Sequence, residues 1–459
     1  MWQLSRAMLL PALALSQLVA PSPATNERRG VEDVALGPPV RTYAECQRTT
    51  CRPLAGCPPG TLFVSATSPQ ANFTTIQAAI ASLPHDDTAH TILIAPGTYT
   101  EQLNVTRPGP LTLLGQTDAP FQPASPPHAD VRSDTDHANA VTVIWSAANA
   151  DSTGKLTDNA YTSVLTIAPT WEASLTGTGP TGFPVPADTA PGSRDVRLYN
   201  LDVRNLAADR AAGPALALGV SYARASFYGC GFYSFQDTVY VGKRGRAFFY
   251  DCVVAGEVDF LYGFGTAWVE RSTLALRNCG GGITAWKGMY GVIPSMLSIL
   301  STYILFSCYV CADERRCTIC VAGTNTTFPN KYGAYISSSR VLAANRTVAG
   351  AIEGRCPLGR PWNTLHRSVF MNSYLDASVL PAGYVRWQDA DPRFDAATTL
   401  EAVYRNQGPG YDAAAMAASN VTTVLDDAGV GPYATPRDVF MGWEGEPDDL
   451  SWIDQSVLK

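Results

Sequence analysis

The chain has 459 residues and a formal net charge of −7, and charged residues make up 16% of it. The sequence is acidic and has no cluster of Lys or Arg, which excludes a nucleic-acid partner. Apolar residues make up 46%, with 38 Gly and 33 Pro, a composition typical of a folded β-rich protein and not of a disordered one. Repetitive β folds of this length often form one domain.

The N-terminus has the order of features found in secretory signal peptides. Met1–Arg6 ends on a basic residue, Ala7–Ala20 is an apolar run, and small residues follow. The run is shorter than the roughly 20 residues that a membrane span requires. We therefore predict a signal peptide over 1–20 and a secreted protein. The sequons that agree with an extracellular glycoprotein are Asn72, Asn104, Asn325, Asn345 and Asn420.

Residues 21–60 form a Cys/Pro-rich N-terminal extension, and 61–459 is predicted to be one β domain. The extension holds Cys46, Cys51 and Cys57, which could hold a cap together, although their pairing cannot be read from the sequence. From Thr61 onward, short apolar runs alternate with turn residues. The runs that we predict as strands are Leu62–Val64, Thr91–Ile94, Leu111–Leu114, Val141–Ile144 and Val196–Tyr199.

The segments between and after these strands complete the predicted organisation. Ile76–Leu83 has helical periodicity and is predicted to cap the first coil. Asp151–Arg194 is rich in Thr, Gly and Pro and is expected to form long loops. Ala396–Arg405 and Ala413–Ala418 are predicted as short helices packed on the outside. Strands without tight hairpin turns favour parallel coils.

A 22-residue repeat is the most informative feature of the chain. Cys230 and Cys252 are separated by this distance, and so are Asp237 and Asp259. A period of 20–30 residues with strand-like segments indicates a solenoid, whose coils stack about 4.8 Å apart. The two aspartates should therefore lie side by side, with pKa values that separate because both cannot easily ionise. The two cysteines should stack in the same way, either as a disulfide or as two buried thiols.

Four ordered motifs resemble those of the pectin methylesterases. They are Phe73–Ile80 with Ile92–Tyr99 and Glu101, Gln236–Thr238, Val258–Gly263, and Leu358–Trp362. The resemblance covers about Phe73 to Trp452. It implies an all-β, right-handed parallel β-helix with a short N-terminal cap helix and external C-terminal helices. It further implies a secreted, fungal-type, monomeric enzyme that hydrolyses the methyl esters of polygalacturonate (pectin), without cofactor, metal or membrane partner.

The resemblance also implies roles for individual residues. Asp259, kept ionised and oriented by Arg360, would be the nucleophile, and Asp237 would be the general acid and then the base. Gln236 would donate a hydrogen bond to the oxyanion. The candidates for stacking on sugar rings are Trp362 and Trp387, although core or rim packing is a comparable alternative for each. The sequence has no GxSxG motif, and its five His show no metal-ligand spacing.

One position departs from the family pattern. Where the family usually carries a second oxyanion Gln, in a stretch like Gln-Ala-Val-Ala-Leu, this chain has Pro214 followed by Ala215–Leu218. Losing one oxyanion donor typically costs about 10²–10³ in rate. The protein could thus be a slow esterase, recruit another donor, or be a catalytically impaired β-helix protein that binds pectin. A pectate lyase shares the fold but would need a calcium site and a basic residue for proton abstraction.

Residues 289–323 differ in character from the rest. Ile293–Val310 is almost continuously apolar, and two CxxC pairs, Cys308/Cys311 and Cys317/Cys320, follow. A membrane helix fits the length but would separate the two aspartates from Arg360 across a bilayer. A zinc site fits the cysteines, but the pairs stand closer together than is usual.

Translated intron sequence is the interpretation that we favour for 289–323. Codons for Gly288–Tyr290 can contain a splice donor, GTATGT, and those for Ala322–Gly323 can supply the acceptor CAG. Cutting there rebuilds one Gly between Lys287 and Thr324. A genuine loop insertion is the remaining alternative.

Overall fold

The computed structural model describes residues 43–123, 139–149, 156–177, 189–288, 331–441 and 446–458. All of them belong to the unit that spans Tyr43–Lys459. The predicted signal peptide (1–20), residues 21–42 of the N-terminal extension and the suspected insertion (289–323) lie outside the described residues, so those assignments stay predictions.

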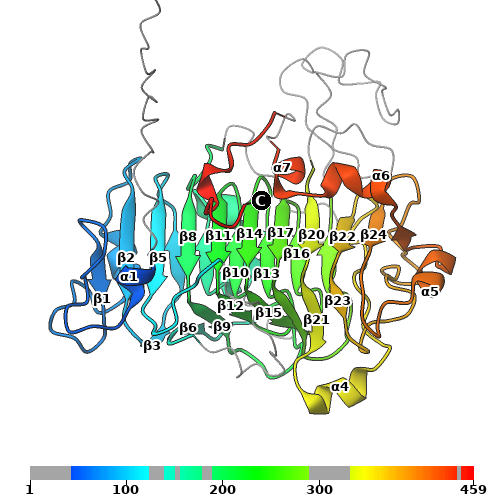
Figure 1. Ribbon diagram of the computed structural model, residues 1–459, viewed down its shortest axis with the longest axis horizontal. Coiled ribbons are helices and arrows are strands. Elements are labelled where there is room, and N and C mark those ends of the chain that lie inside the picture. Colours follow the sequence, from blue (N-terminus) through cyan, green and yellow to red (C-terminus); the bar gives the residue numbers. More distant parts are fainter. Residues whose placement is uncertain are drawn as a thin grey trace, which may run out of the picture. The chain divides into compact units, whose positions relative to one another are not determined.

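The described strands form three parallel sheets that wind into a right-handed parallel β-helix, as predicted (Figure 1). Sheet A contains β1 (Leu62–Val64), β2 (His90–Ile94), β5 (Leu111–Gly115), β8 (Val196–Tyr199), β11 (Arg224–Tyr228), β14 (Arg246–Tyr250), β17 (Thr266–Glu270), β20 (Gly333–Ser337), β22 (Arg367–Met371), β24 (Leu400–Tyr404) and β25 (Thr423–Val424). Sheet B contains β3 (Gly97–Thr100), β6 (Val141–Trp145), β9 (Asp202–Asn205), β12 (Gly231–Tyr233), β15 (Val253–Gly256), β18 (Thr273–Leu276), β21 (Arg340–Ala343) and β23 (Tyr374–Leu375). Sheet C contains β4 (Leu103–Val105), β7 (Leu165–Ile167), β10 (Leu218–Val220), β13 (Val239–Val241), β16 (Leu261–Gly263) and β19 (Thr284–Trp286).

The 22-residue period sets the register between neighbouring coils. Phe227 pairs with Phe249 in sheet A, and their rings stack 4.8 Å apart inside the helix. Val239 pairs with Leu261 in sheet C, so residues one period apart share a column, as predicted. Such stacking fills the interior with apolar side chains that are almost wholly removed from water.

Sharp corners between sheets A and B depend on residues in the left-handed backbone region. The residue after each of seven successive sheet-A strands has positive φ: Asn200, Gly229, Asp251, Arg271, Ser338, Asn372 and Arg405. Gly, Asn and Asp tolerate this conformation best, which explains four of these corners, while Arg and Ser adopt it under the constraint of the surrounding sheet.

Helices lie at the ends and on the outside of the solenoid (Figure 1). They are α1 (Ala44–Gln47), α2 (Ile76–Ala81), η1 (Asn159–Thr162), α3 (Trp171–Ser174), α4 (Arg346–Ile352), α5 (Ala413–Ala418), α6 (Asp427–Val430), η2 (Gly431–Tyr433), α7 (Pro436–Val439) and η3 (Leu450–Trp452). The cap helix α2 and the external helix α5 confirm two predictions. No helix among the described residues is both long and apolar enough to cross a membrane.

Two sequence predictions about local structure were wrong. Ala396–Arg405 was expected to be helical, but Leu400–Tyr404 is a buried strand that pairs with β22. Pairing in the sheet overrides the helix propensity of Ala and Glu there. Asp151–Arg194 was expected to form loops, yet Leu165–Ile167 is a strand of sheet C between β4 and β10.

The cysteines pair at two points of the described chain. Cys46–Cys57 ties down the N-terminal segment, and Cys279–Cys356 joins two neighbouring coils. Cys230 and Cys252 are buried free thiols, which is the second of the two alternatives that the period allowed, and Cys51 is free and exposed.

Candidate active site

The two aspartates lie at equivalent positions on neighbouring coils, at the beginning of sheet C. Gln236 bridges to Val258, and the backbone N–H of Asp237 donates to the carbonyl of Val258 at 3.0 Å. Both aspartates have left-handed backbone conformations, with φ of 60° for Asp237 and 48° for Asp259. The chain therefore makes the same turn twice, which confirms the predicted stacking of the two residues.

Asp259 forms a two-point ion pair with Arg360, the contact that the sequence predicted. Arg360 Nε donates to Oδ1 at 2.9 Å and Nη2 donates to Oδ2 at 2.7 Å. The backbone N–H of Gly282 also donates to Oδ1, at 3.1 Å. Three donors thus hold this carboxylate in one orientation.

A glycine-rich coil lets Arg360 reach Asp259. Gly282 lies on the next coil, where its carbonyl accepts from the backbone N–H of Asp259. Gly359 lies one coil further and bridges to Thr284, which is on the same coil as Gly282. A Cβ atom on Gly281 would stand 2.8 Å from Oδ1 of Asp259 and 3.1 Å from Nη2 of Arg360. The missing side chain leaves the space through which the guanidinium reaches across the intervening coil.

Asp237 has the opposite electrostatic environment. Burial raises its pKa well above the usual range, and the negative charge of Asp259 raises it further, while Arg360 opposes this shift. Its only side-chain donor among the described residues is Asn159, whose Nδ2 lies 3.3 Å from Oδ2. A carboxyl with a raised pKa thus lies next to one that is ion-paired, the arrangement that separates an acid from a nucleophile.

Two asparagines at this site were missed by the sequence analysis. Asn149 Nδ2 donates to Oδ1 of Asn159 at 2.8 Å, and the backbone N–H of Asn149 donates to the carbonyl of Pro214 at 2.8 Å. Asn159 begins η1, in a segment that was expected to form loops. No period or motif marks either residue, so the sequence held no signal for them.

The other predicted residues lie around the same place. Gln236 is partly exposed next to Asp237. Trp362 and Trp387 are both partly buried and pack against the apolar cluster that contains Tyr262 and Leu216. Each tryptophan therefore packs one part of its side chain against this cluster and leaves another part exposed.

Arginine and lysine side chains lie against the two tryptophans. Arg360 lies 4.0 Å from the ring centre of Trp387, and Arg393 lies 4.3 Å from it. Lys287 Nζ lies 3.3 Å from the ring centre of Trp362, and burial lowers the pKa of this lysine to about 6. Near neutral pH, Trp362 therefore borders an amine that is mostly uncharged.

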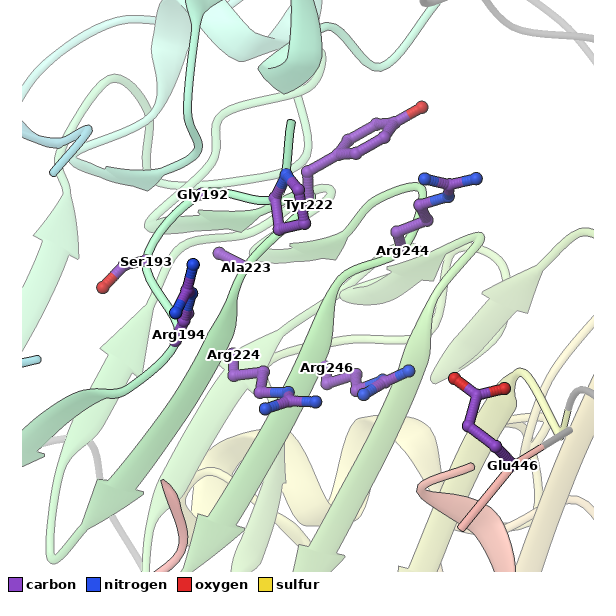
Figure 2. A pocket seen from close by; sticks show the side chains of 10 residues that line it. Gly192, Ser193, Arg194, Tyr222, Ala223, Arg224, Arg244, Arg246 and Glu446 are labelled. Carbon is purple, nitrogen blue, oxygen red and sulfur yellow. The ribbon is translucent and has the colours of Figure 1, made fainter. Parts of the chain in front are cut away.

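A separate pocket of about 290 Å³ lies where the sheet-C strands β10 and β13 end, whereas the two aspartates lie where sheet-C strands begin (Figure 2). Its charged lining residues are Arg194, Arg224, Arg244, Arg246 and Glu446. Arg224 and Arg246 each donate to the carboxylate of Asp448 at 2.6 Å. These pairs attach the C-terminal segment to sheet A, and none of the predicted site residues lines the pocket.

Comparison with known proteins agrees with this geometry. The pectinesterase family model matches residues 187–284 and 301–431. A probable pectinesterase A of Aspergillus niger is 26% identical over 400 residues, covering 86% of this chain and 92% of the relative. The pectin methylesterase from carrot has a similar fold, with a TM-score of 0.56 and 20% identity over 82% of this chain and 92% of that one.

A pectin methylesterase solved in complex with a hexasaccharide is also similar. Its TM-score is 0.53, with 22% identity over 82% of this chain and 96% of that one. The matched residues of the family model contain both aspartates and Arg360, and the relatives are matched over most of their length. The chain belongs to the pectinesterase family.

Proposed function

We propose that this protein is a secreted pectin methylesterase, which hydrolyses the methyl esters of polygalacturonate to methanol and free carboxylates. The observation that carries the proposal is the unequal pair of aspartates. Asp259 is held by the guanidinium of Arg360 at 2.9 and 2.7 Å, and the neighbouring Asp237 has a raised pKa. Ester hydrolysis by a carboxylate needs this combination of a charged nucleophile and a protonated acid.

The reaction follows from these protonation states. An oxygen of Asp259 attacks the ester carbonyl carbon, and the carbonyl electron pair moves onto its oxygen, where Gln236 donates a hydrogen bond. When the oxyanion collapses, the bond to the methoxy oxygen breaks, and Asp237 gives its proton to that oxygen to release methanol. The product of this half is an anhydride between the substrate and Asp259.

Water completes the cycle. Asp237, now ionised, removes a proton from a water molecule, which attacks the substrate-derived carbonyl carbon of the anhydride. The bond to Asp259 breaks, the free galacturonate carboxyl leaves, and Asp237 is protonated again. Water is the only co-reactant: one of its protons replaces the proton that Asp237 gave to methanol, and its hydroxyl group becomes part of the galacturonate carboxyl.

Sugar binding is assigned to Trp362 and Trp387. Both rings are partly exposed beside the aspartates, and aromatic rings pack well on the apolar faces of sugars. A related pectin methylesterase has been solved in complex with a hexasaccharide. We extend this kind of ligand to the present chain, as methyl-esterified homogalacturonan bound by one copy of the protein.

Export and the excision of 289–323 belong to the same proposal. The basic start and the apolar run to Ala20 support a signal peptide. Strand β20, which follows the suspected insertion, pairs directly with β17, which precedes it. The coils that flank the segment are thus consecutive, which fits both excision and a loop inserted between two coils. Sequencing the transcript across codons 288–323 tests this.

Methanol release from highly methyl-esterified pectin tests the function. The proposal predicts one new carboxylate for each methanol, no shortening of the polymer, and no effect of a calcium chelator. Binding of pectin without methanol release would instead identify an impaired β-helix protein. Cleavage with unsaturated ends that chelator abolishes would identify a lyase.

A further inference from the structure

The residue at the position of the missing oxyanion glutamine takes part in a chain of contacts that ends at the catalytic acid. Pro214 has no side-chain donor, but its carbonyl accepts a hydrogen bond from the backbone of Asn149 at 2.8 Å. The side chain of Asn149 in turn donates to Asn159 at 2.8 Å. The amide of Asn159 then donates to Asp237 at 3.3 Å. A side-chain amide therefore reaches the aspartate pair from another part of the chain.

The contacts fix the direction of the Asn159 amide. Its Oδ1 accepts from Asn149, and its Nδ2 faces Asp237. The same carbonyl of Pro214 that anchors Asn149 is part of the stretch that borders Asp237, because Ala215 N–H donates to the carbonyl of Gln236 at 3.0 Å. The amide is thus oriented before any substrate binds, which is the condition for useful electrostatic stabilisation.

We propose that Asn159 is a catalytic residue of this esterase, and that its amide supplies the second oxyanion donor that Pro214 cannot provide. This inference rests on the proposed function. An amide NH₂ carries two hydrogens. One donates to Oδ2 of Asp237 in the resting site, and the second is the donor assigned to the carbonyl oxygen of the ester. Asn149 is a positioning residue, since it acts only by holding Asn159.

The assignment gives Asn159 a defined part in each half of the reaction. While Asp259 adds to the ester carbon and the carbonyl electron pair moves to oxygen, the amide and Gln236 donate to the developing negative charge. When Asp237 has passed its proton to methanol, the first hydrogen of the amide stabilises the new carboxylate. Since Oδ2 accepts from Asn159, we assign the acidic proton of Asp237 to Oδ1.

The first test replaces Asn159 by Leu, which has a similar size but no donor. We expect kcat on methyl-esterified pectin to fall about 10²-fold with little change in KM, because the lost bond strengthens in the transition state. The matched control is Asn139→Leu, which removes an amide that donates to the carboxylate of Asp202 at 2.9 Å outside the site. The control should keep wild-type kcat.

A second substitution, which adds an amide at position 214, distinguishes a loss of catalysis from a loss of folding. Pro214→Gln places a donor where relatives carry one. In the wild-type background it should change kcat by less than about threefold, because Asn159 already fills the role. In the Asn159→Leu background it should raise kcat at least about tenfold above that of the single variant, since one oxyanion donor is worth about 10²–10³ in rate. Thermal unfolding of all variants is measured alongside.

Three results would overturn the assignment. One is an Asn159→Leu protein that keeps kcat within about threefold of wild type. Another is a loss that follows a fall in melting temperature and that Pro214→Gln does not recover. The third is a strong gain from Pro214→Gln in the wild-type background, which would mean that no second donor is present.

A titration independent of turnover distinguishes failure of this inference from failure of the proposed function. Carboxyl-carbon NMR of ¹³C-aspartate protein, assigned with Asp237→Asn, follows the ionisation of Asp237. Loss of the Asn159 hydrogen bond should raise the pKa of Asp237 further, because that bond favours the ionised form. An unchanged titration overturns the inference even if the wild-type protein releases methanol. If the titration shift is seen but the wild-type protein has no esterase activity, the contact between Asn159 and Asp237 is supported and the proposed function is refuted.

Discussion

Replacing Arg360 tests the electrostatic logic of the site, and the structure sets the size of the effect. Arg360 makes two charge-assisted hydrogen bonds to Asp259, at 2.9 and 2.7 Å. Such bonds are worth about 1.5–3 kcal/mol each. The arginine side chain is 21% exposed, so we take the lower value for each bond. Together they give about 3 kcal/mol, which is about 10²-fold in rate at 1.36 kcal/mol per factor of ten.

Arg360→Ala should therefore lower kcat/KM about 10²-fold. Arg360→Lys keeps the charge but loses the two-point geometry, so about a tenfold loss is expected. Removing the arginine also removes the positive charge that lowers the pKa of Asp237. That pKa rises, and Asp237 stays protonated to higher pH. The alkaline limb of the pH–rate profile of Arg360→Ala should then move to higher pH.

Methanol release across a pH series measures both effects, with Arg393→Ala as the matched control. Arg393 covers the same Trp387 ring at 4.3 Å, but its own carboxylate partner is Asp391. The control should change KM more than kcat. An Arg360→Ala enzyme within about threefold of wild-type kcat would refute the reasoning. So would an equal loss of kcat in Arg393→Ala.

Three further predictions concern close packing and buried acids. Gly281→Ala should cut kcat by at least about tenfold with little change in melting temperature, because its Cβ would stand 2.8 Å from Oδ1 of Asp259; wild-type kcat in this variant would contradict the packing argument. Asp237→Asn should abolish methanol release. It should also reduce the loss of folding stability at alkaline pH. Because the pKa of Asp237 is raised in the folded protein, its contribution to stability is present at low pH and is lost as the pH rises through that pKa. Glu401→Gln should flatten the same pH dependence, since burial raises the pKa of Glu401 and neither of its carboxyl oxygens has a hydrogen-bond partner among the described residues. Calorimetric melting temperatures between about pH 5 and about pH 9 check both variants, and parallel curves for variant and wild type would contradict the assignment.

Periodicity accounts for what could be predicted from the sequence. The interval from Asp237 to Asp259 equals one coil, so it gave the register of sheet C and the stacking of the two carboxyl groups. Short apolar runs such as Leu111–Leu114 also marked strands correctly, because each coil must bury one side of every strand. Local composition misled only where the sheet imposed its own conformation, as at Leu400–Tyr404.

Contacts between distant parts of the chain could not be predicted. Asn159 reaches Asp237 from a segment with no repeat, and its position depends on Asn149 and the carbonyl of Pro214. A single sequence does not state which loop folds over which coil. The role of Gly281 was likewise hidden, because a missing side chain has meaning only once its neighbours are placed.

The most direct test of the account is methanol release by wild type and three single variants on the same methyl-esterified pectin. Asp259→Ala and Asp237→Asn each remove one half of the pair, and Asp251→Asn alters another buried aspartate with left-handed backbone at a different corner. The account predicts robust release by wild type and Asp251→Asn, with none above background for the two site variants. Undiminished release by Asp259→Ala, or no release by the wild-type protein, would contradict it.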